Sequence, residues 1–400
     1  MNHRHLLAAA AATIALLGVR TASAIDCSTL PNPVFIQNGD TQEPLMKQLG
    51  KALRESTVNP ITIVYRNSGS CTNIEAMYSG TKLTVNPSYV PSAAEDPTWD
   101  PSKPSPQCTI APGGEDLDLA ISALFVTACN PDPAPAGLAV FTGPVQPYLF
   151  VVPQASSQEA IWAEEAYFTF GFGNSGTANP WTDESFFHIR TATKSTLLTI
   201  AANITVPAVK MKGIPWDKSS EVMAAVSASP EPDKTIGLLG AELYDQNRDA
   251  LNALAFKAFG QRHAYYPDST RESFDKQNVR DGHYTIWSPT EYIAKVDGQG
   301  DIVDPDVAYI VGLILGSGVD PEPDFEPLDI LVGGVKLVPD CAMKVKRGGE
   351  GADLSPYDPA EPCHCYFEAT LGTPSASCTE CEDDSPCGGG TCRHGYCEAH

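Results

Sequence analysis

A short apolar run, a turn and an amphipathic segment follow one another three times in this chain of 400 residues, and this order restricts the fold more than any other feature. The first unit has the apolar run 34–37, the turn Asn38-Gly39, and a segment that Asp40 or Thr41 can cap as a helix. We therefore predict a strand, a turn and a helix. The helix carries leucines four residues apart, which fall on one face: Leu45, Leu49 and Leu53.

The second unit repeats this order with a different turn. The apolar run 61–65 leads to the turn 67–70, which is rich in Ser, Asn and Gly. In the helix that follows, Thr72 and Glu75 have the spacing of a capping box, and Gly80 can end the helix.

The third unit comes in the middle of the chain. The run 186–189 leads to Arg190, and an apolar helical segment starts at Ser195-Thr196. Strands that alternate with helices in this way favour an α/β protein with largely parallel sheets.

The three turns share a property that suits a negatively charged ligand. At a helix N-terminus four backbone N–H groups lack partners within the helix, and the helix dipole adds roughly half a positive charge. Helix starts that follow parallel strands meet at the ligand crevice of an open α/β sheet, where Arg190 and Lys194 would add fixed charge. The alternative is that Thr41, Ser70 and Thr196 are ordinary helix caps. The candidate ligand-binding residues are Thr41, Ser70, Arg190, Lys194, Ser195 and Thr196.

Four short motifs resemble, in their order, those of a known family. Gly39-Asp40-Thr41 resembles a Gly-x-Thr turn after the first strand, and Gly69-Ser70-Cys71 resembles a Gly-Ser-Ser turn after the second. Arg190 with Lys194-Ser195-Thr196 resembles an Arg followed by Ser-Gly-Thr, and 282–284 resembles a later Gly-x-Tyr segment. The family is that of the periplasmic phosphate-binding proteins and, more broadly, of the type 2 periplasmic solute-binding proteins. The resemblance covers approximately residues 33–340.

The resemblance implies an α/β chain with a two-lobed type 2 periplasmic-binding-protein fold, followed here by a small disulfide-rich tail. Two segments near 141–152 and 284–289 would cross between the lobes as a hinge, and closure of the lobes would capture the ligand. An ABC-type permease or a cell-surface protein is the implied partner. The expected parts are a signal peptide in 1–24, lobe 1 in 25–145 plus 290–340, lobe 2 in 146–289, and the Cys-rich tail in 341–400.

The chain departs from the family pattern at the proposed site. The local alignment of 118–123 places Ala123 where the family has a carboxylate that accepts the proton of phosphate. Lys194 and Ser195 stand where the family has Ser and Gly. Without the acceptor, a fully ionised oxyanion such as sulfate is no longer repelled. The expected ligand is therefore a small oxyanion that is phosphate-like, sulfate or a carboxylate.

The N-terminal residues predict export. A basic start, the apolar run 6–19 and Ala22-Ser23-Ala24 form the pattern of a cleaved signal peptide, so we expect a periplasmic or secreted protein. The apolar run is shorter than the roughly 20 residues that span a bilayer, so no membrane insertion is expected, and Cys27 lacks a lipoprotein context. With 49 acidic and 26 basic residues, the formal charge of −23 excludes a nucleic-acid binder held by bulk charge.

Twelve cysteines, eight of them after residue 340, predict disulfides in an exported protein. Zinc would also accept the tail cysteines, but export favours disulfide bonds. The loop 91–114 would be closed by a pairing of Cys108 with Cys129. The aspartates of 301–306 have calcium-like spacing without the closing Glu, so a solvated acidic turn is expected and no metal site is assigned.

These features favour a binding protein over an enzyme. No nucleophile elbow and no His-Glu-x-x-His pair occurs, so we assign no catalytic residue and no cofactor. The predicted function is an exported solute-binding protein that captures a small oxyanion between two lobes. The alternative is an extracellular interaction or structural protein with a vestigial cleft.

Overall fold

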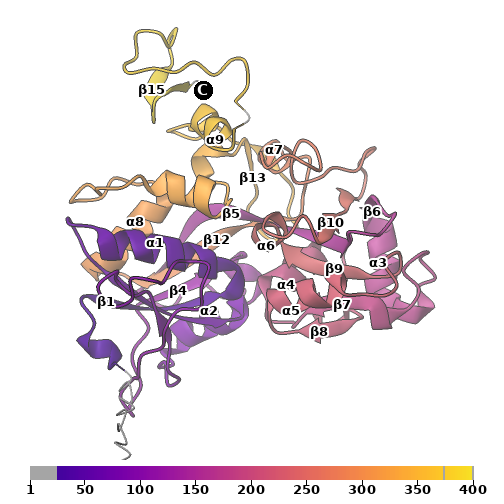
Figure 1. Ribbon diagram of the computed structural model, residues 1–400, viewed down its shortest axis with the longest axis horizontal. Coiled ribbons are helices and arrows are strands. Elements are labelled where there is room, and N and C mark those ends of the chain that lie inside the picture. Colours follow the sequence, from indigo (N-terminus) through magenta and orange to yellow (C-terminus); the bar gives the residue numbers. More distant parts are fainter. Residues whose placement is uncertain (1–24, 373, 399–400) are drawn as a thin grey trace, which may run out of the picture.

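The computed structural model describes residues 25–372 and 374–398. Its helices and strands form two lobes that lie side by side, with a small tail projecting from one edge (Figure 1). The predicted fold class is confirmed, because the chain is an α/β protein of two lobes with a disulfide-bonded C-terminal tail. The predicted signal peptide, 1–24, lies outside the described residues.

Lobe 1 is built on three parallel strands. β1 (Pro33–Gly39) pairs with β2 (Thr62–Ser68) on one side and with β4 (Leu119–Ser122) on the other. β3 (Ser88–Tyr89) adds a short antiparallel edge to β2. α1 (Glu43–Glu55) follows β1, as predicted, and the predicted leucine stripe is buried. Its members are at most 2% exposed: Leu45, Leu49 and Leu53.

Lobe 2 repeats the parallel arrangement. β7 (Phe187–Arg190) pairs in parallel with β8 (Ile214–Trp216) and with β9 (Ile236–Gly240). Since parallel strands end at the same edge of a sheet, the turns after these strands lie together. Three helices begin in these turns: α4 (Ser195–Asn203), α5 (Ser219–Ser227) and α6 (Ala241–Asp245).

Two long strands join the lobes into one sheet of ten strands. β5 (Leu138–Pro153) pairs with β12 (Trp287–Lys295) through its first half and with β9 through its second half. β12 also pairs with β4, and β10 (Leu251–Ala253) pairs with the end of β5. β5 therefore crosses from one lobe to the other in the region where the sequence predicts a hinge segment.

The remaining helices cover the sheet or lie in the loops around it (Figure 1). α2 (Ser70–Ser79) follows β2 and packs on β4 and β1, and α8 (Pro305–Leu315) packs on β5. Among the described residues, no helix is long and apolar enough to cross a membrane. The other elements are α3 (Ala163–Phe172), α7 (Gln277–Arg280), α9 (His364–Thr370), and the paired strands β6 (Ala160–Trp162) with β11 (Ala255–Lys257), β13 (Val345–Lys346) with β14 (Ser355–Pro356), and β15 (Thr391–Arg393) with β16 (Tyr396–Glu398).

The predicted capping box in the second unit is wrong. α2 begins at Ser70, two residues before Thr72, and Gly69 is its N-cap without a side-chain cap bond. The end of the helix is as predicted, since Gly80 adopts the left-handed conformation with φ 65°. The local Thr-x-x-Glu spacing therefore places the start of this helix too late.

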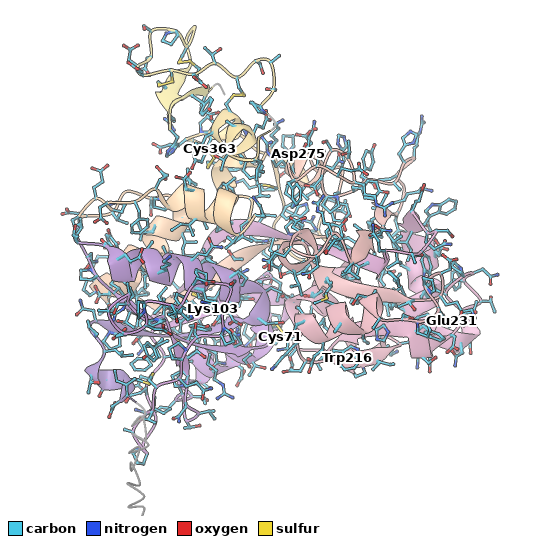
Figure 2. All side chains as sticks on the ribbon, viewed as in Figure 1. Cys71, Lys103, Trp216, Glu231, Asp275 and Cys363 are labelled. Atoms are coloured by element: carbon cyan, nitrogen blue, oxygen red, sulfur yellow. A yellow bond between two sulfur atoms is a disulfide. The ribbon has the colours of Figure 1, made fainter. Side chains whose placement is uncertain are left out.

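All twelve cysteines form disulfides, which confirms the predicted oxidation but not the predicted Cys108–Cys129 pair. Cys108 instead binds Cys27 in lobe 1, and Cys71, at the start of α2, binds Cys129. Figure 2 shows Cys71 near the junction of the lobes and Cys363 at the base of the tail. The four remaining bonds lie in the C-terminal segment: Cys341–Cys363, Cys365–Cys378, Cys381–Cys392 and Cys387–Cys397.

The first part of the C-terminal segment packs on the two lobes. Arg280 of α7 binds Glu368 of α9, with 3.1 Å between Nη1 and Oε1. The buried carboxyl of Glu350 accepts a hydrogen bond of 2.5 Å from Ser288 of β12, one of the strands that join the lobes. The contact between Glu350 and Ser288 therefore connects the C-terminal segment with the junction of the lobes. That a separate domain starts near residue 341 stays a prediction.

Candidate functional site

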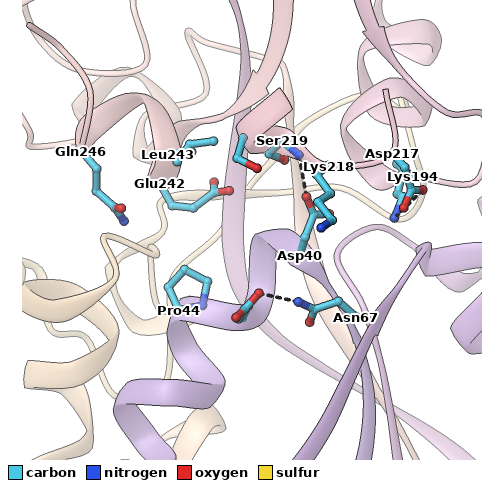
Figure 3. Close-up of a pocket in the computed structure, with 12 residues that line it drawn as sticks. Asp40, Pro44, Asn67, Lys194, Asp217, Lys218, Ser219, Glu242, Leu243 and Gln246 are labelled. Atoms are coloured by element: carbon cyan, nitrogen blue, oxygen red, sulfur yellow. Dashed lines mark hydrogen bonds and ion pairs between the residues drawn. The ribbon is translucent and has the colours of Figure 1, made fainter. Parts of the chain in front are cut away.

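A cleft of about 380 Å³ lies between the two lobes. Asp40 and Glu43 line it from lobe 1, and Lys194, Ser219 and Glu242 line it from lobe 2. These side chains converge from the turns after β1, β7, β8 and β9 (Figure 3). The cleft therefore combines helix starts with charged groups of both signs.

Arg190 is the most deeply buried cation beside this cleft, with 1% of its surface exposed. It is the last residue of β7, and β8 and the turn after it hold its guanidinium in place. Nε donates to the carbonyl of Trp216 at 3.3 Å, Nη2 donates to the carbonyl of Asp217 at 2.7 Å, and Nη1 donates to the hydroxyl of Ser219. These contacts come from lobe 2 alone, so lobe 2 orients Arg190 without help from lobe 1.

Asp40 reaches across the cleft from lobe 1 to Arg190. Both of its carboxylate oxygens lie 3.0 Å from Nη2 of Arg190. Oδ2 also accepts the backbone N–H of Ser219 at 2.8 Å, and Figure 3 shows this second contact. The predicted capping role for Asp40 or Thr41 is wrong, because α1 begins at Glu43 after Gln42, without a side-chain cap bond.

The surroundings of Asp40 favour its ionised form. Burial disfavours the charge, but the positive charge of Arg190 and the hydrogen bonds from Ser219 and Arg190 outweigh burial, so the pKa of Asp40 lies below its usual value. At neutral pH the site therefore contains a carboxylate anion held by a guanidinium and a backbone N–H at the start of α5.

Of the candidate residues, Lys194 lines the cleft directly. Its Nζ lies 3.3 Å from a carboxylate oxygen of Asp217, whose side chain is 73% exposed. Asp217 thus contacts both cations, Lys194 through its carboxylate and Arg190 through its carbonyl, and its exposed carboxylate can turn away at little cost.

Ser70 and Ser195 lie deeper, behind the cleft. The hydroxyl of Ser70 accepts a hydrogen bond of 3.2 Å from the backbone N–H of Ala123, and Tyr148 of β5 donates to the carbonyl of Ala123. Ser195 lies beside the hydroxyl of Tyr148. The structure thus brings both serines to Ala123 and Tyr148 rather than to the cleft wall.

Thr41 and Thr196 are buried, and their hydroxyls have no hydrogen-bond partner among residues 25–372 and 374–398. Thr41 follows Asp40 in a 3-10 turn, and Thr196 lies in the first turn of α4. Neither is a helix cap in the structure, so the alternative of ordinary capping does not hold for them.

Sequence reasoning missed Ser219 and Glu242. Ser219 begins α5 after β8, and Lys218-Ser219-Ser220-Glu221 carried a helix-start signal in its Glu221. Glu242 follows Gly240 at the end of β9 and lies in α6, so this stretch is a further unit of strand, turn and helix. These two units carry the same local pattern as the three recognised ones.

A second chain of hydrogen bonds connects the lobes beside Asp40. Gln42 donates to Gln146 of β5, and Gln146 donates to Glu242 at 2.6 Å. Burial raises the pKa of Glu242 to about 8, against the hydrogen bonds from its own backbone and Gln146, so this carboxyl is protonated at neutral pH. The ionised carboxylate of Asp40 and the neutral carboxylic acid of Glu242 therefore line the same cleft.

The lobes also touch where α2 and α4 begin. The backbone N–H of Cys71 donates to the carbonyl of Thr193 at 3.3 Å. A Cβ on Gly69 would lie 2.5 Å from Oγ1 of Thr193 and 2.7 Å from its carbonyl oxygen. Gly69 is therefore required for this close approach between the lobes.

Replacement of Gly69 by Ala is expected to lower the free energy of unfolding by about 1 to 3 kcal/mol, the usual cost of inserting a methyl group into a packed contact. Urea denaturation measures the change. Gly298→Ala is the matched control, because its Cβ would meet no atom within 4 Å. Equal stability of the two variants would show that the lobes do not meet at Thr193.

Comparisons with known proteins bear on the fold alone. No protein-family model matches the chain, and no curated protein matches it in sequence. Solved structures match at low identity. A substrate-binding protein from Clostridium perfringens with bound phosphate is 13% identical, with a TM-score of 0.47, over 77% of this chain and 99% of that one.

Two further matches are a transport receptor and a regulatory domain. An ABC-type phosphate transport receptor from Vibrio cholerae is 12% identical, with a TM-score of 0.43, over 70% of this chain and 93% of that one. The reduced OxyR regulatory domain from Pseudomonas aeruginosa is 8% identical, with a TM-score of 0.39, over 70% and 95%. Phosphate-binding proteins are thus among the structural neighbours, but at these scores the ligand is argued from the site itself.

Proposed function

We propose that the cleft between the lobes binds a small oxyanion, with Arg190 as its main contact, and that the chain acts as a solute-binding protein. The observation that supports this proposal is that the carboxylate of Asp40 accepts hydrogen bonds from the guanidinium of Arg190 and from the backbone N–H of Ser219. A group of the chain itself has the charge and the oxygen atoms of the proposed ligand, and it is held by the same donors. Because Asp217 is exposed, it can turn away from Lys194 and leave this second cation for further ligand oxygens.

The ligand class follows from the chemistry of the donors. A guanidinium holds two oxygens at once and stays charged, and a backbone N–H at a helix start adds a fixed dipole. Glu242, which is neutral at neutral pH, can donate its O–H to an ionised oxygen, and its other oxygen already accepts a hydrogen bond from Gln146. These groups favour sulfate or a carboxylate over protonated phosphate.

Three further parts of the proposal concern the location, the partner and the activity of the protein. Export to the periplasm or the medium is proposed from residues 1–24 of the sequence. An ABC-type permease or a cell-surface protein is the proposed partner, and binding without catalysis is the proposed activity.

A ligand panel on the full chain tests the function. Sulfate, phosphate and acetate are titrated in turn, and one of them should raise stability by about 2.7 kcal/mol at a hundredfold excess over its Kd. Stability is measured by thermal unfolding, and calorimetric titration gives the affinity.

Arg190→Ala should lower the affinity for that anion by about 2 kcal/mol or more, because truncation removes a hydrogen-bonded charge contact. Arg190→Lys keeps the charge but not the forked geometry, and it should recover part of the affinity. Arg262→Ala is the control, since Arg262 is exposed and away from the cleft lining. Unchanged affinity in Arg190→Ala would mean that the anion binds elsewhere.

One observation favours a second candidate function, an extracellular interaction or structural protein with a vestigial cleft. Every nitrogen of the Arg190 guanidinium already donates to a group of the chain: Asp40, Trp216, Asp217 and Ser219. If no anion of the panel stabilises the protein, this second function accounts better for the site.

A further inference from the structure

Arg190 and Ser219 form an anion site that lobe 2 assembles by itself. The carbonyls of Trp216 and Asp217 and the hydroxyl of Ser219 fix the guanidinium, and these residues run from the end of β8 to the start of α5. The N–H of Ser219 adds the last donor. Among the hydrogen bonds of the described residues, no carboxylate of lobe 2 accepts from these donors. Arg190 is nevertheless buried, with 1% of its surface exposed.

The anion on this site comes from lobe 1. Asp40 lies in the turn directly after β1, 150 residues before Arg190 in the sequence. Its carboxylate makes no cap bond to α1, which begins three residues later with an N-cap that uses no side chain. The side chain of Asp40 thus serves the other lobe, and its contacts join the two lobes across the cleft.

We propose that Asp40 is a built-in ligand of Arg190, which holds the cleft closed in the absence of solute and must leave before an external oxyanion can occupy the same donors. This inference rests on the proposed function and goes beyond it, because it assigns to Asp40 the control of the affinity for the external oxyanion. Two anions cannot share the single Nη2 of Arg190 and the single N–H of Ser219. Binding therefore depends on the fraction of molecules in which Asp40 has been displaced.

The charge around Asp40 adds to this competition. Like charges repel strongly in a buried site, so an external oxyanion beside an ionised Asp40 would be bound weakly. A ligand that carries its own carboxylate can reproduce both contacts of Asp40, whereas a neutral solute lacks the negative charge that faces Arg190. Asp40 therefore also selects for ionised ligands.

The experiment compares Asp40→Ala with Asp116→Ala in the full chain. Asp116 is the matched control, because it is an exposed carboxylate of the same lobe, which pairs with Lys82 at 3.2 Å outside the cleft. Both variants lose one negative charge. Asp40→Asn is a second variant, which keeps the side-chain shape and removes the charge.

Anion affinity and lobe opening are measured separately. Asp40→Ala should bind sulfate or acetate about tenfold or more tightly than the unmutated chain, because no internal ligand reduces the competent fraction. Formate and acetate should raise the melting temperature of Asp40→Ala by more than they raise that of Asp116→Ala. Without anions, hydrogen exchange at amides 39–42 and 217–220 should be faster in Asp40→Ala, because the lobes separate there.

The outcomes separate this inference from the proposed function. Faster exchange together with tighter anion binding supports both. Faster exchange without any anion binding supports the closing role of Asp40 and shows that the proposed function is wrong. Exchange and affinity equal to those of Asp116→Ala would overturn the inference, and Asp40→Asn decides the matter if Asp40→Ala does not fold.

Discussion

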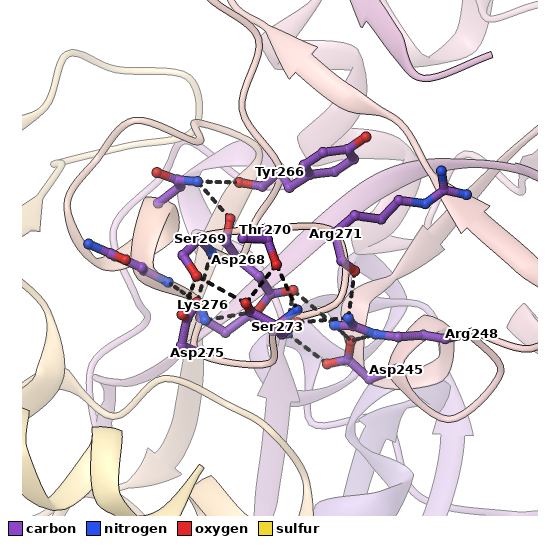
Figure 4. A network of polar contacts seen from close by, with 12 residues as sticks. Asp245, Arg248, Tyr266, Asp268, Ser269, Thr270, Arg271, Ser273, Asp275 and Lys276 are labelled. Carbon is purple, nitrogen blue, oxygen red and sulfur yellow. Dashed lines mark hydrogen bonds and ion pairs between the residues drawn. The ribbon is translucent and has the colours of Figure 1, made fainter. Parts of the chain in front are cut away.

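Replacement of Lys276 by Met is expected to lower the free energy of unfolding by about 3 to 5 kcal/mol, the usual cost of removing one partner from a buried ion pair. Nζ of Lys276 lies 2.7 Å from Asp245 and 2.9 Å from Asp268, and the three side chains are at most 4% exposed. Arg248 completes the network through both aspartates (Figure 4). Without Lys276, two carboxylates compete for one guanidinium in a buried site.

Electrostatics support this expectation. Burial lowers the pKa of Lys276, but the charges of Asp245 and Asp268 outweigh burial and raise the pKa above its usual value. The ammonium is therefore charged throughout the neutral range, and the stability that it supplies is lost only when the pH rises through its raised pKa.

Urea denaturation of Lys276→Met against Lys234→Met gives the measurement. Lys234 pairs with Glu231 at 3.0 Å, but both side chains are about half exposed, so its replacement should cost less than about 1 kcal/mol. A loss in Lys276→Met no larger than that in the control would show that the network does not stabilise the fold. Burial raises the pKa of Asp268, so acidification should reduce the loss in Lys276→Met by neutralising this carboxyl.

The sequence predicts the framework of the lobes because the signals for it are local. The leucine spacing of α1 and the apolar run of β2 depend on neighbouring residues, and both elements occur as expected. Gly80 ends α2 in the left-handed conformation for the same reason. Periodicity and turn chemistry therefore suffice for the order of strands and helices.

The chemistry of the cleft could not be predicted in the same way, because it depends on contacts between lobes. An aspartate after a strand is locally a helix cap, and only the folded chain places Asp40 on Arg190. Likewise, Cys108 pairs with Cys27 and not with Cys129, which is nearer in the sequence, since Asp26 ahead of β1 pairs with Thr109 next to Cys108. The resemblance to phosphate-binding proteins indicated Arg190, but it placed Asp40 at the variable position of the Gly-x-Thr turn and gave it no role.

The second large expected effect comes from Glu242, whose contribution to the free energy of unfolding should fall as the pH rises from about 5.5 to 8. Its folded-state pKa is about 8 because of burial, whereas an unfolded Glu titrates near its ordinary value of 4.5. Between these values the folded chain holds a proton that the unfolded chain has released. Stability is therefore present at the acid end and is lost at about 1.4 kcal/mol per pH unit as the folded pKa is approached.

Glu291 adds to this slope over the lower part of the range. Burial raises its pKa to about 7, against a hydrogen bond from the backbone N–H of Val126. Carboxyls with lowered pKa values, such as Asp324 at about 2, have released their protons in both states above pH 5.5 and do not oppose the trend.

Glu242→Gln should remove about 1.4 kcal/mol per pH unit from this slope, because Gln keeps the shape of the protonated acid and does not titrate. The variant should match the unmutated chain near pH 5.5 and exceed its stability near pH 8. Urea denaturation at a series of pH values measures both slopes, with the exposed Glu55→Gln as control. Parallel pH profiles of Glu242→Gln and the unmutated chain would contradict the assignment of the proton to Glu242.

The same proton connects stability with binding. Gln42, Gln146 and Glu242 form a hydrogen-bonded chain between the lobes, so loss of the proton leaves a charge inside the closed cleft and favours opening. An ionised Glu242 would also repel an oxyanion on Arg190, whereas a protonated one can donate to it. Anion affinity should therefore weaken as the pH rises towards 8 in the unmutated chain and stay constant in Glu242→Gln, and calorimetric titration of sulfate at both ends of the range measures this difference.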